Sequence, residues 1–136
     1  MRTINRIFIH VSDSPDTLDI GTKEITRWHS DPPPKGNGWS DIGYHGVVRR
    51  NGVLELGRPI SKIGSHAKGH NSDSIGLCWV GRTVPTAVQY QSLLNATRLL
   101  MAVYGIKADQ VLGHKEVDPG KSCPNLDMVK FRKDLA

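Results

Sequence analysis

The sequence lacks the hydrophobic runs that export or membrane insertion require. Crossing a bilayer takes about 18 consecutive apolar residues, and no such run occurs among the 136 residues. The N-terminal residues lead into only three apolar positions, 7–9, before a histidine. A signal-peptide core needs roughly 7 to 15 apolar residues. We therefore expect a protein made in the cytoplasm, with no export signal of its own and no membrane partner.

Cysteine and aromatic residues are also scarce. Two cysteines in a chain made in the cytoplasm argue against a disulfide and leave each thiol free for packing or for a metal. Only 6% of the residues are aromatic, and the scattered basic residues, which give a net charge of +5, lack the interleaved aromatics of a strand-binding groove. The charge favours polyanionic surroundings, nucleic acid or a bacterial envelope. The missing aromatics argue against a specific nucleic-acid partner.

The hydrophobic pattern predicts one α/β domain over residues 1–136, with a central mixed sheet of about five strands flanked by about three helices. Apolar and alternating runs predict strands at residues 6–11, 44–50, 53–56, 74–81 and 110–114, and Asn51-Gly52 predicts a hairpin turn between the second and third. Helices are expected from residue 22, from Thr86 to Gly105 and over 126–135; the middle one begins with a capping box of Thr86 and Gln89.

Three potential metal ligands lie near the ends of predicted strands. His10 ends the first strand, His114 ends the last, and Cys123 follows nine residues later. Two imidazoles and one thiolate, with a fourth position left open, are typical of a catalytic zinc, because structural zinc sites normally close all four positions. Neither His-Glu-x-x-His nor Cys-x-x-Cys occurs. The residues alone thus leave an alternative, two partly buried histidines with satisfied hydrogen bonds and a cysteine that packs as a small hydrophobe.

Five blocks along the chain resemble, in order, those of a known enzyme family. They are IFIHVS at 7–12, WSDIGYH at 39–45, GSHAKGHN at 64–71, SIGLCWVG at 74–81 and GHKEVDPGKSCP at 113–124. Together they are similar to the zinc-dependent N-acetylmuramoyl-L-alanine amidases that share the peptidoglycan-recognition-protein fold. The likeness is greatest to the short phage lysozymes that act as amidases, the endolysins.

This resemblance implies roles for six residues. His10, His114 and Cys123 would bind one Zn²⁺ per chain, and Tyr44 and Lys121 would be catalytic. Lys121 would stabilise the oxyanion, whereas Tyr44 would either hydrogen-bond the attacking water or pass a proton to the leaving amine. The resemblance also places His66 in the substrate groove, with a solvated loop residue as the alternative.

The expected function is that of a phage endolysin. Such an enzyme would cleave the amide between N-acetylmuramic acid and the L-alanine of the stem peptide in peptidoglycan, and so lyse the host. We expect it to act as a monomer without a separate wall-binding domain, and to stay in the host cytoplasm until the membrane is permeabilised and the periplasmic peptidoglycan becomes accessible. The alternative is a peptidoglycan-recognition binding module, or an inhibitor of a phage RNA polymerase, on the same fold.

Five other polar side chains have less specific predictions. His45 is expected to support the core or the site from behind, His29 to pack or to interact with a helix dipole, and His70 to be exposed. Cys78 is expected to be a core residue. Glu116 would either orient a metal ligand or be a solvated carboxylate.

Overall fold

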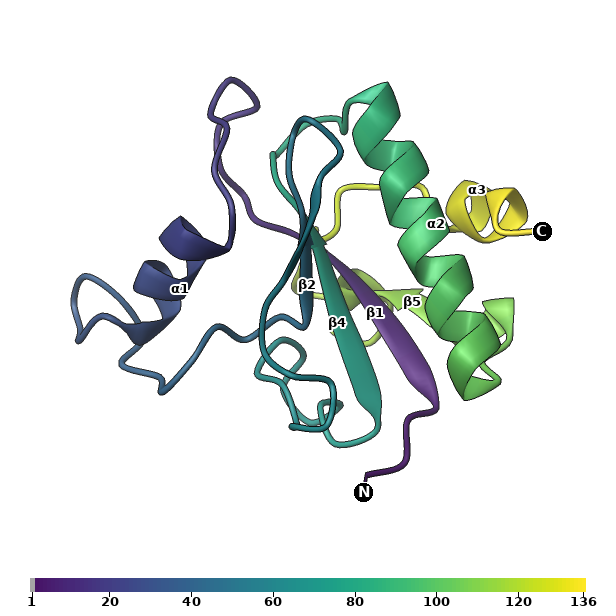
Figure 1. The fold of residues 1–136 in the computed structure, drawn as a ribbon, viewed down its shortest axis with the longest axis horizontal. Coiled ribbons are helices and arrows are strands. Elements are labelled where there is room, and N and C mark those ends of the chain that lie inside the picture. Colours follow the sequence, from purple (N-terminus) through teal and green to yellow (C-terminus); the bar gives the residue numbers. More distant parts are fainter. Residues whose placement is uncertain (1) are drawn as a thin grey trace.

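A five-stranded sheet forms the middle layer of the structure, a computed structural model that describes residues 2–136 (Figure 1). The strands are β1 (Arg6–Val11), β2 (Gly46–Val48), β3 (Leu54–Leu56), β4 (Ser74–Trp79) and β5 (Val111–Gly113). Their spatial order is β3-β2-β4-β1-β5, and every neighbouring pair is parallel except the antiparallel pair β2–β3. The mixed α/β sheet predicted from the sequence is confirmed.

Helices cover both faces of this sheet. The helices are α1 (Thr22–Ser30), α2 (Ala87–Tyr104) and α3 (Met128–Asp134), with short 3-10 turns η1 (Ala108–Gln110) and η2 (His114–Glu116) on either side of β5. Helices α2 and α3 lie together on one side of the sheet, and α1 lies apart on the other (Figure 1). None of the helices formed by residues 2–136 is both long and apolar enough to cross a membrane.

Alternation along β1 divides its side chains between two cores. Ile7, Ile9 and Val11 face the larger core beneath α2 and α3, which also contains Leu93. The smaller core, next to α1, is built from Ile20, Ile25, Ile42, Val47, Cys78 and Val80. Because successive strand residues point to opposite faces, His10 is directed away from the larger core. A polar residue of the site is thus held on a strand that is otherwise apolar.

The strongest local patterns gave the correct element boundaries. Strand β1 and helix α2 occupy the predicted residues, and the Thr86 hydroxyl accepts the backbone N–H of Gln89 as a capping box requires. The hairpin strands are shorter than predicted, because residues 49–53 form the turn: Arg49 N–H donates to Val53 O, and Gly52 has φ +88°.

The predicted ends of two elements near the C-terminus were wrong. Strand β5 is shorter than 110–114, since Gln110 belongs to η1 and His114 begins η2. Helix α3 starts only at Met128, after Asp127 as its N-cap. Asn125, which precedes the predicted start of this helix, has a positive φ and donates its side-chain amide to Arg82 O.

The side chain of Gln89 joins α2 to the sheet. It is fully buried. Its Nε2 donates to Val48 O at 2.9 Å and to Val80 O at 2.8 Å, and its Oε1 accepts from the backbone N–H of Thr86 at 3.1 Å. This residue therefore fixes the beginning of α2 against β2 and the end of β4, beyond its role in the capping box.

Replacing Gln89 with leucine should lower the free energy of unfolding by about 1–3 kcal/mol. The carbonyl oxygens of Val48 and Val80 would each lose the hydrogen bond from Gln89, and leucine offers no substitute donor. Urea denaturation followed by circular dichroism measures this loss. Gln91→Leu is the matched control, since Gln91 lies two residues further along α2, is exposed, and should change stability by no more than about 0.5 kcal/mol. Equal stability of the two variants would contradict the proposed role of Gln89.

Candidate metal centre and active site

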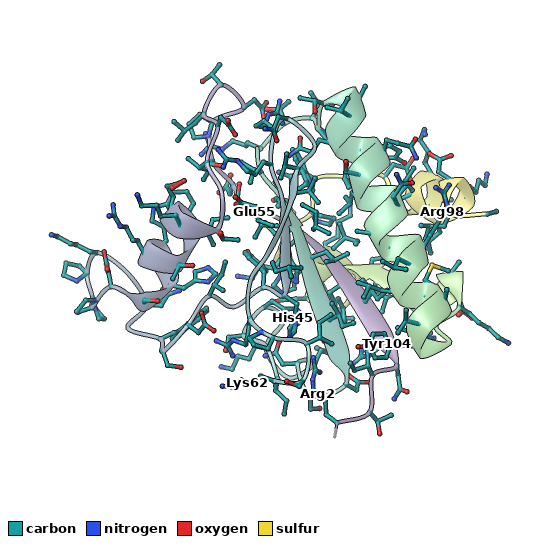
Figure 2. The ribbon with its side chains drawn as sticks, in the orientation of Figure 1. Arg2, His45, Glu55, Lys62, Arg98 and Tyr104 are labelled. Carbon is teal, nitrogen blue, oxygen red and sulfur yellow. The ribbon has the colours of Figure 1, made fainter. Side chains whose placement is uncertain are left out.

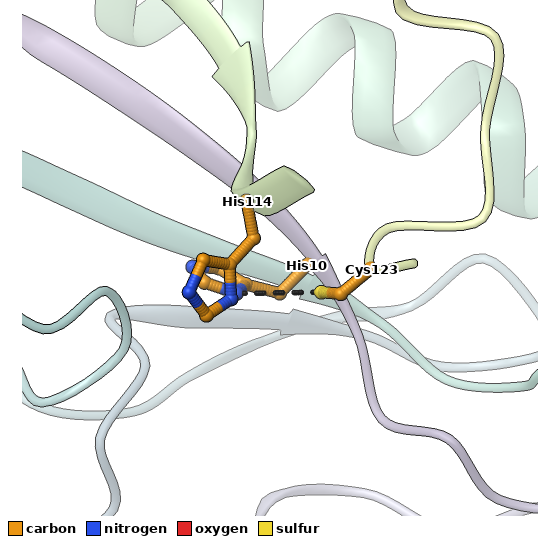
Figure 3. Close-up of side chains that lie close together, drawn as sticks. All are labelled: His10, His114 and Cys123. Atoms are coloured by element: carbon orange, nitrogen blue, oxygen red, sulfur yellow. Dashed lines mark hydrogen bonds between the residues drawn. The ribbon is translucent and has the colours of Figure 1, made fainter. Parts of the chain in front are cut away.

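The three predicted metal ligands meet at the carboxyl ends of β1 and β5. These strands are parallel neighbours with Ile9 opposite Gly113, so the next residues, His10 and His114, lie at the same edge of the sheet. Cys123 reaches them from the loop that follows η2 (Figure 3). One potential ligand atom from each residue lies within 4.8 Å of the others. The sequence prediction that these residues come together agrees with the geometry.

The donor atoms fit a tetrahedral metal. Cys123 Sγ lies 3.6 Å from His10 Nδ1. Around a tetrahedral zinc with ordinary bond lengths, sulfur and nitrogen ligands stand roughly 3.5 Å apart. Burial lowers the pKa of both His10 and His114, which favours the neutral imidazole that a metal needs. Burial also raises the pKa of the Cys123 thiol to about 11, so a thiolate here requires a cation beside it.

Backbone and indole hydrogen bonds hold the cysteine loop in place. Lys115 N–H donates to Cys123 O at 2.8 Å, and Trp79 Nε1 donates to Pro124 O at 2.8 Å. The backbone N–H of Val11 points at Cys123 Sγ at 3.3 Å. The thiol is therefore directed at β1 by groups from three separate segments of the chain.

Glu116 supports His114 through the backbone. Its carboxylate accepts the N–H of Gly113 at 2.8 Å and binds both terminal nitrogens of Arg132 at 2.7 and 2.9 Å. Of the two earlier alternatives, the structure agrees with the exposed carboxylate, because Glu116 is an exposed residue, but its carboxylate is not left to solvent alone. Instead it closes η2 and ties that turn to α3, which fixes the position from which His114 starts.

Tyr44 faces the ring of His10. The two ring centroids are 5.2 Å apart, and the Tyr44 side chain packs on the smaller core that contains Cys78. Burial, together with the Cys78 and Cys123 thiols, raises the pKa of Tyr44 well above its ordinary value. The phenol therefore keeps its proton at neutral pH. Cys78 itself is fully buried, as predicted for a core residue.

His29 packs beside Tyr44, in agreement with one of its two predicted roles, but its hydrogen bond to the segment before Tyr44 was not predicted. Its Nδ1 accepts the backbone N–H of Gly43 at 2.8 Å, directly before Tyr44, and its ring lies 5.4 Å from the Tyr44 ring. Helix α1 that carries His29 is anchored to the sheet, because Glu55 of β3 accepts the N–H of Thr22 at 2.8 Å. No local pattern in the sequence reveals this contact, which depends on where α1 docks.

A groove of about 470 Å³ is lined by His114, one of the three candidate ligands. Trp39, His66, Lys68, His114 and Lys121 are among the residues that line it. Lys121 is exposed, and its ammonium lies close enough to His114 and Cys123 to lower the pKa of both side chains. Burial has the larger effect on each: it lowers the pKa of His114 and raises that of Cys123. A cationic side chain thus borders the groove beside the donor cluster.

The other loop histidines have structural contacts. His45 is buried, accepts the N–H of Gly76 at 3.0 Å through Nδ1, and lies 2.8 Å from Lys62 O through Nε2, with Arg2 beside it (Figure 2). This agrees with a supporting role. The prediction that His70 is exposed was wrong, because its ring is partly buried 6.0 Å from Phe8.

Comparison with known proteins places the chain in a family. The family model described as N-acetylmuramoyl-L-alanine amidase matches residues 1–126. The chain belongs to the N-acetylmuramoyl-L-alanine amidase family. The endolysin of Escherichia phage T7 is 38% identical to the amidase over 133 residues, covering 92% of this chain and 83% of the phage protein. The endolysin of Klebsiella phage KP32 is 36% identical over 133 residues, covering 93% and 84%.

Solved structures support the same assignment. The amidase superposes on the N-acetylmuramoyl-L-alanine amidase LysC from Clostridium intestinale URNW with a TM-score of 0.85 and 29% identity, covering 98% of this chain and 86% of LysC. Drosophila PGRP-LB shares the fold, with a TM-score of 0.77 at 24% identity over 91% of the amidase and 76% of PGRP-LB. The predicted resemblance to amidases of the peptidoglycan-recognition-protein fold is confirmed.

Arg132→Met should lower the free energy of unfolding at pH 7 by about 1 kcal/mol, since both side chains of the ion pair are only partly exposed. The guanidinium is the main cause of the lowered pKa of Glu116. Because the pKa of Glu116 is lower in the folded protein than in the unfolded chain, where it is about 4.3, the ion pair stabilises the fold at pH values above 4.3. This stabilisation disappears as the pH falls through the pKa of the folded state.

Urea denaturation of both proteins at pH 7 and pH 3 tests this. The stability difference between wild type and variant should shrink at pH 3. A difference that is unchanged or larger at low pH would show that Arg132 acts through packing rather than through its ion pair with Glu116.

Proposed function

We propose that this amidase is a zinc-dependent peptidoglycan hydrolase of the phage endolysin type, which cleaves the amide between N-acetylmuramic acid and the L-alanine of the stem peptide. The observation that carries the proposal is the cluster of His10, His114 and Cys123 beside a groove, in a member of the N-acetylmuramoyl-L-alanine amidase family. Retention of all three donors favours an enzyme over a module that only binds peptidoglycan.

His10, His114 and Cys123 would hold the zinc, beside the groove that His114 also lines. When bound, zinc supplies a Lewis acid and lowers the pKa of its water, so that a nucleophile is available at neutral pH. Burial keeps the two imidazoles neutral and thus ready to bind the metal.

Tyr44 and Lys121 would act on the substrate amide. Because the phenol of Tyr44 keeps its proton, it serves as a hydrogen-bond donor to the scissile group or the leaving amine rather than as a base. Lys121 has a charged side chain at the edge of the groove, where it would stabilise negative charge that develops on the carbonyl oxygen. His66 lines the same groove and would contact the substrate.

The similarity to phage endolysins supports a role in host lysis. In this role residues 1–136 act as a single catalytic domain and as a monomer. The protein stays in the host cytoplasm until the membrane is permeabilised and then degrades periplasmic peptidoglycan, to which its net charge of +5 attracts it. Inhibition of a phage RNA polymerase stays a prediction, which a transcription assay with added protein tests.

Digestion of purified sacculi, followed by mass spectrometry of the released fragments, tests the reaction. The proposal predicts free stem peptides that begin with L-alanine and glycan strands that keep the lactyl group. Cleavage within the glycan or between amino acids of the stem would contradict it.

Cys123→Ala should abolish zinc binding and activity together, while the protein stays folded, because neither core depends on the cysteine loop for its main contacts. Atomic absorption of the purified variant measures the zinc. Cys78→Ala is the matched control and should lose only about 1–2 kcal/mol of stability, with zinc and activity kept. Full zinc occupancy without Cys123 would refute the ligand set.

Lys121→Met should reduce turnover on sacculi by about 10²- to 10³-fold, because loss of one oxyanion donor typically has that effect. Zinc content and folding should be unchanged, since methionine keeps the length of the side chain and Lys121 is not a ligand. Steady-state digestion rates measure the effect. Lys107→Met is the control and should keep normal turnover. Lys107 is exposed and lies before β5, at the end of that strand opposite to His114. Equal rates in both variants would exclude a catalytic role for Lys121.

A further inference from the structure

A chain of hydrogen bonds leads from His10 into the loop that covers one face of the sheet. His10 Nε2 lies 2.9 Å from His66 Nδ1, and His66 Nε2 lies 3.4 Å from Ser74 Oγ. Ser74 Oγ in turn donates to His70 O at 2.7 Å. The three residues that these hydrogen bonds connect are buried: His10, His66 and Ser74 have exposed fractions of 1%, 8% and 0%. Water therefore does not compete easily for these groups.

The direction of each hydrogen bond in this series follows from its final acceptor, the carbonyl oxygen of His70. A carbonyl oxygen only accepts, so the Ser74 hydroxyl proton points to His70 O and its oxygen can accept from His66 Nε2. In a neutral imidazole one nitrogen donates and the other accepts, so His66 Nδ1 accepts from His10 Nε2. His10 Nδ1 is then left without a proton, and it is this atom that lies 3.6 Å from Cys123 Sγ.

The surroundings of His66 keep its ring in this position. Asn71 Oδ1 accepts the backbone N–H groups of His66 and Ala67 at 3.0 and 2.8 Å, which fixes the loop. The ring lies against Gly76 of β4, where an added Cβ would come within 2.6 Å of its atoms. A side chain at position 76 would therefore push the His66 ring away from the sheet. The glycine leaves the space that the ring needs beside His10.

We propose that His66 is a positioning residue that holds His10 in the tautomer whose bare Nδ1 is presented to the metal. The inference deepens the proposed function and rests on its zinc site. A metal-bound histidine commonly donates its other N–H to a fixed acceptor, and loss of that acceptor typically weakens metal binding or activity by 10- to 100-fold. Here the acceptor is another histidine rather than a carboxylate. This role is separate from the substrate contact proposed above, because loss of a substrate contact alone would change KM and leave zinc affinity unaltered.

Zinc affinity of the purified, metal-stripped protein, measured by competition with a chelator, tests the proposal. His66→Leu removes the acceptor and should weaken Zn²⁺ binding by about 10- to 100-fold. His66→Asn places its Oδ1 near the position of Nδ1 and should restore most of the affinity. His70→Leu is the matched control, because His70 lies on the same loop but its ring contacts Phe8 rather than His10; its affinity should equal that of wild type.

The tautomer of His10 in metal-free wild type gives a readout that does not depend on any variant. Two-bond ¹H–¹⁵N spectra should show His10 protonated on Nε2, and His66→Leu should lose this preference. Protonation of wild-type His10 on Nδ1 would overturn the proposal. So would a His66→Leu variant that binds zinc as tightly as wild type, whether or not its KM rises. Failure of wild type to bind zinc at all would instead overturn the proposed function on which the inference rests.

Discussion

The parallel pairing of β1 with its two neighbours is the constraint on which the site depends. Pairing with β5 brings His10 and His114 to one edge of the sheet, although 104 positions separate them in the sequence. Pairing with β4 sets Gly76 opposite Phe8 and Cys78 opposite His10. Because parallel strands end at the same edge, the loops that follow them converge there as well. Cys123 lies on such a loop, which the hydrogen bonds from Lys115 N–H and Trp79 Nε1 hold beside the two histidines.

Because side chains alternate between the two faces of β1, one face contributes to the larger core and the other carries His10 of the candidate site. Along β1 the odd positions bury apolar side chains against α2 and α3, while the even positions Phe8 and His10 face the loop that carries His66. A shift of one residue in the β1 register would bury His10 in the larger core and move the isoleucines to the opposite face, where Phe8 and His10 now lie, which makes the register energetically well determined. The larger core therefore fixes the direction of His10, a candidate metal ligand, without contacting it.

Local sequence signals predicted the elements, and long-range contacts decided what the signals left open. The apolar run of β1 and the capping box of α2 gave correct boundaries because their information lies within a few residues. The candidate ligands could be named from strand ends and family resemblance. The hydrogen bonds of His29 and Glu116 could not, because each depends on a partner that folding brings near: Gly43 for the first, and Arg132 for the second. Hydrogen-bond direction from His10 to Ser74 likewise exists only once the loop has docked.

The electrostatics of the cluster suit it to a bound cation. Burial favours uncharged forms of His10, His114 and Cys123 alike. For the histidines this is already the form that binds a metal, whereas the thiol must lose its proton, and the required compensation is a positive charge held between the three. The Lys121 ammonium lies on the exposed edge of the groove, and it lowers the pKa of the thiol against the larger effect of burial. The three donors thus make a site suited to a cation, and the exposed Lys121 adds a second positive charge at the edge of the groove.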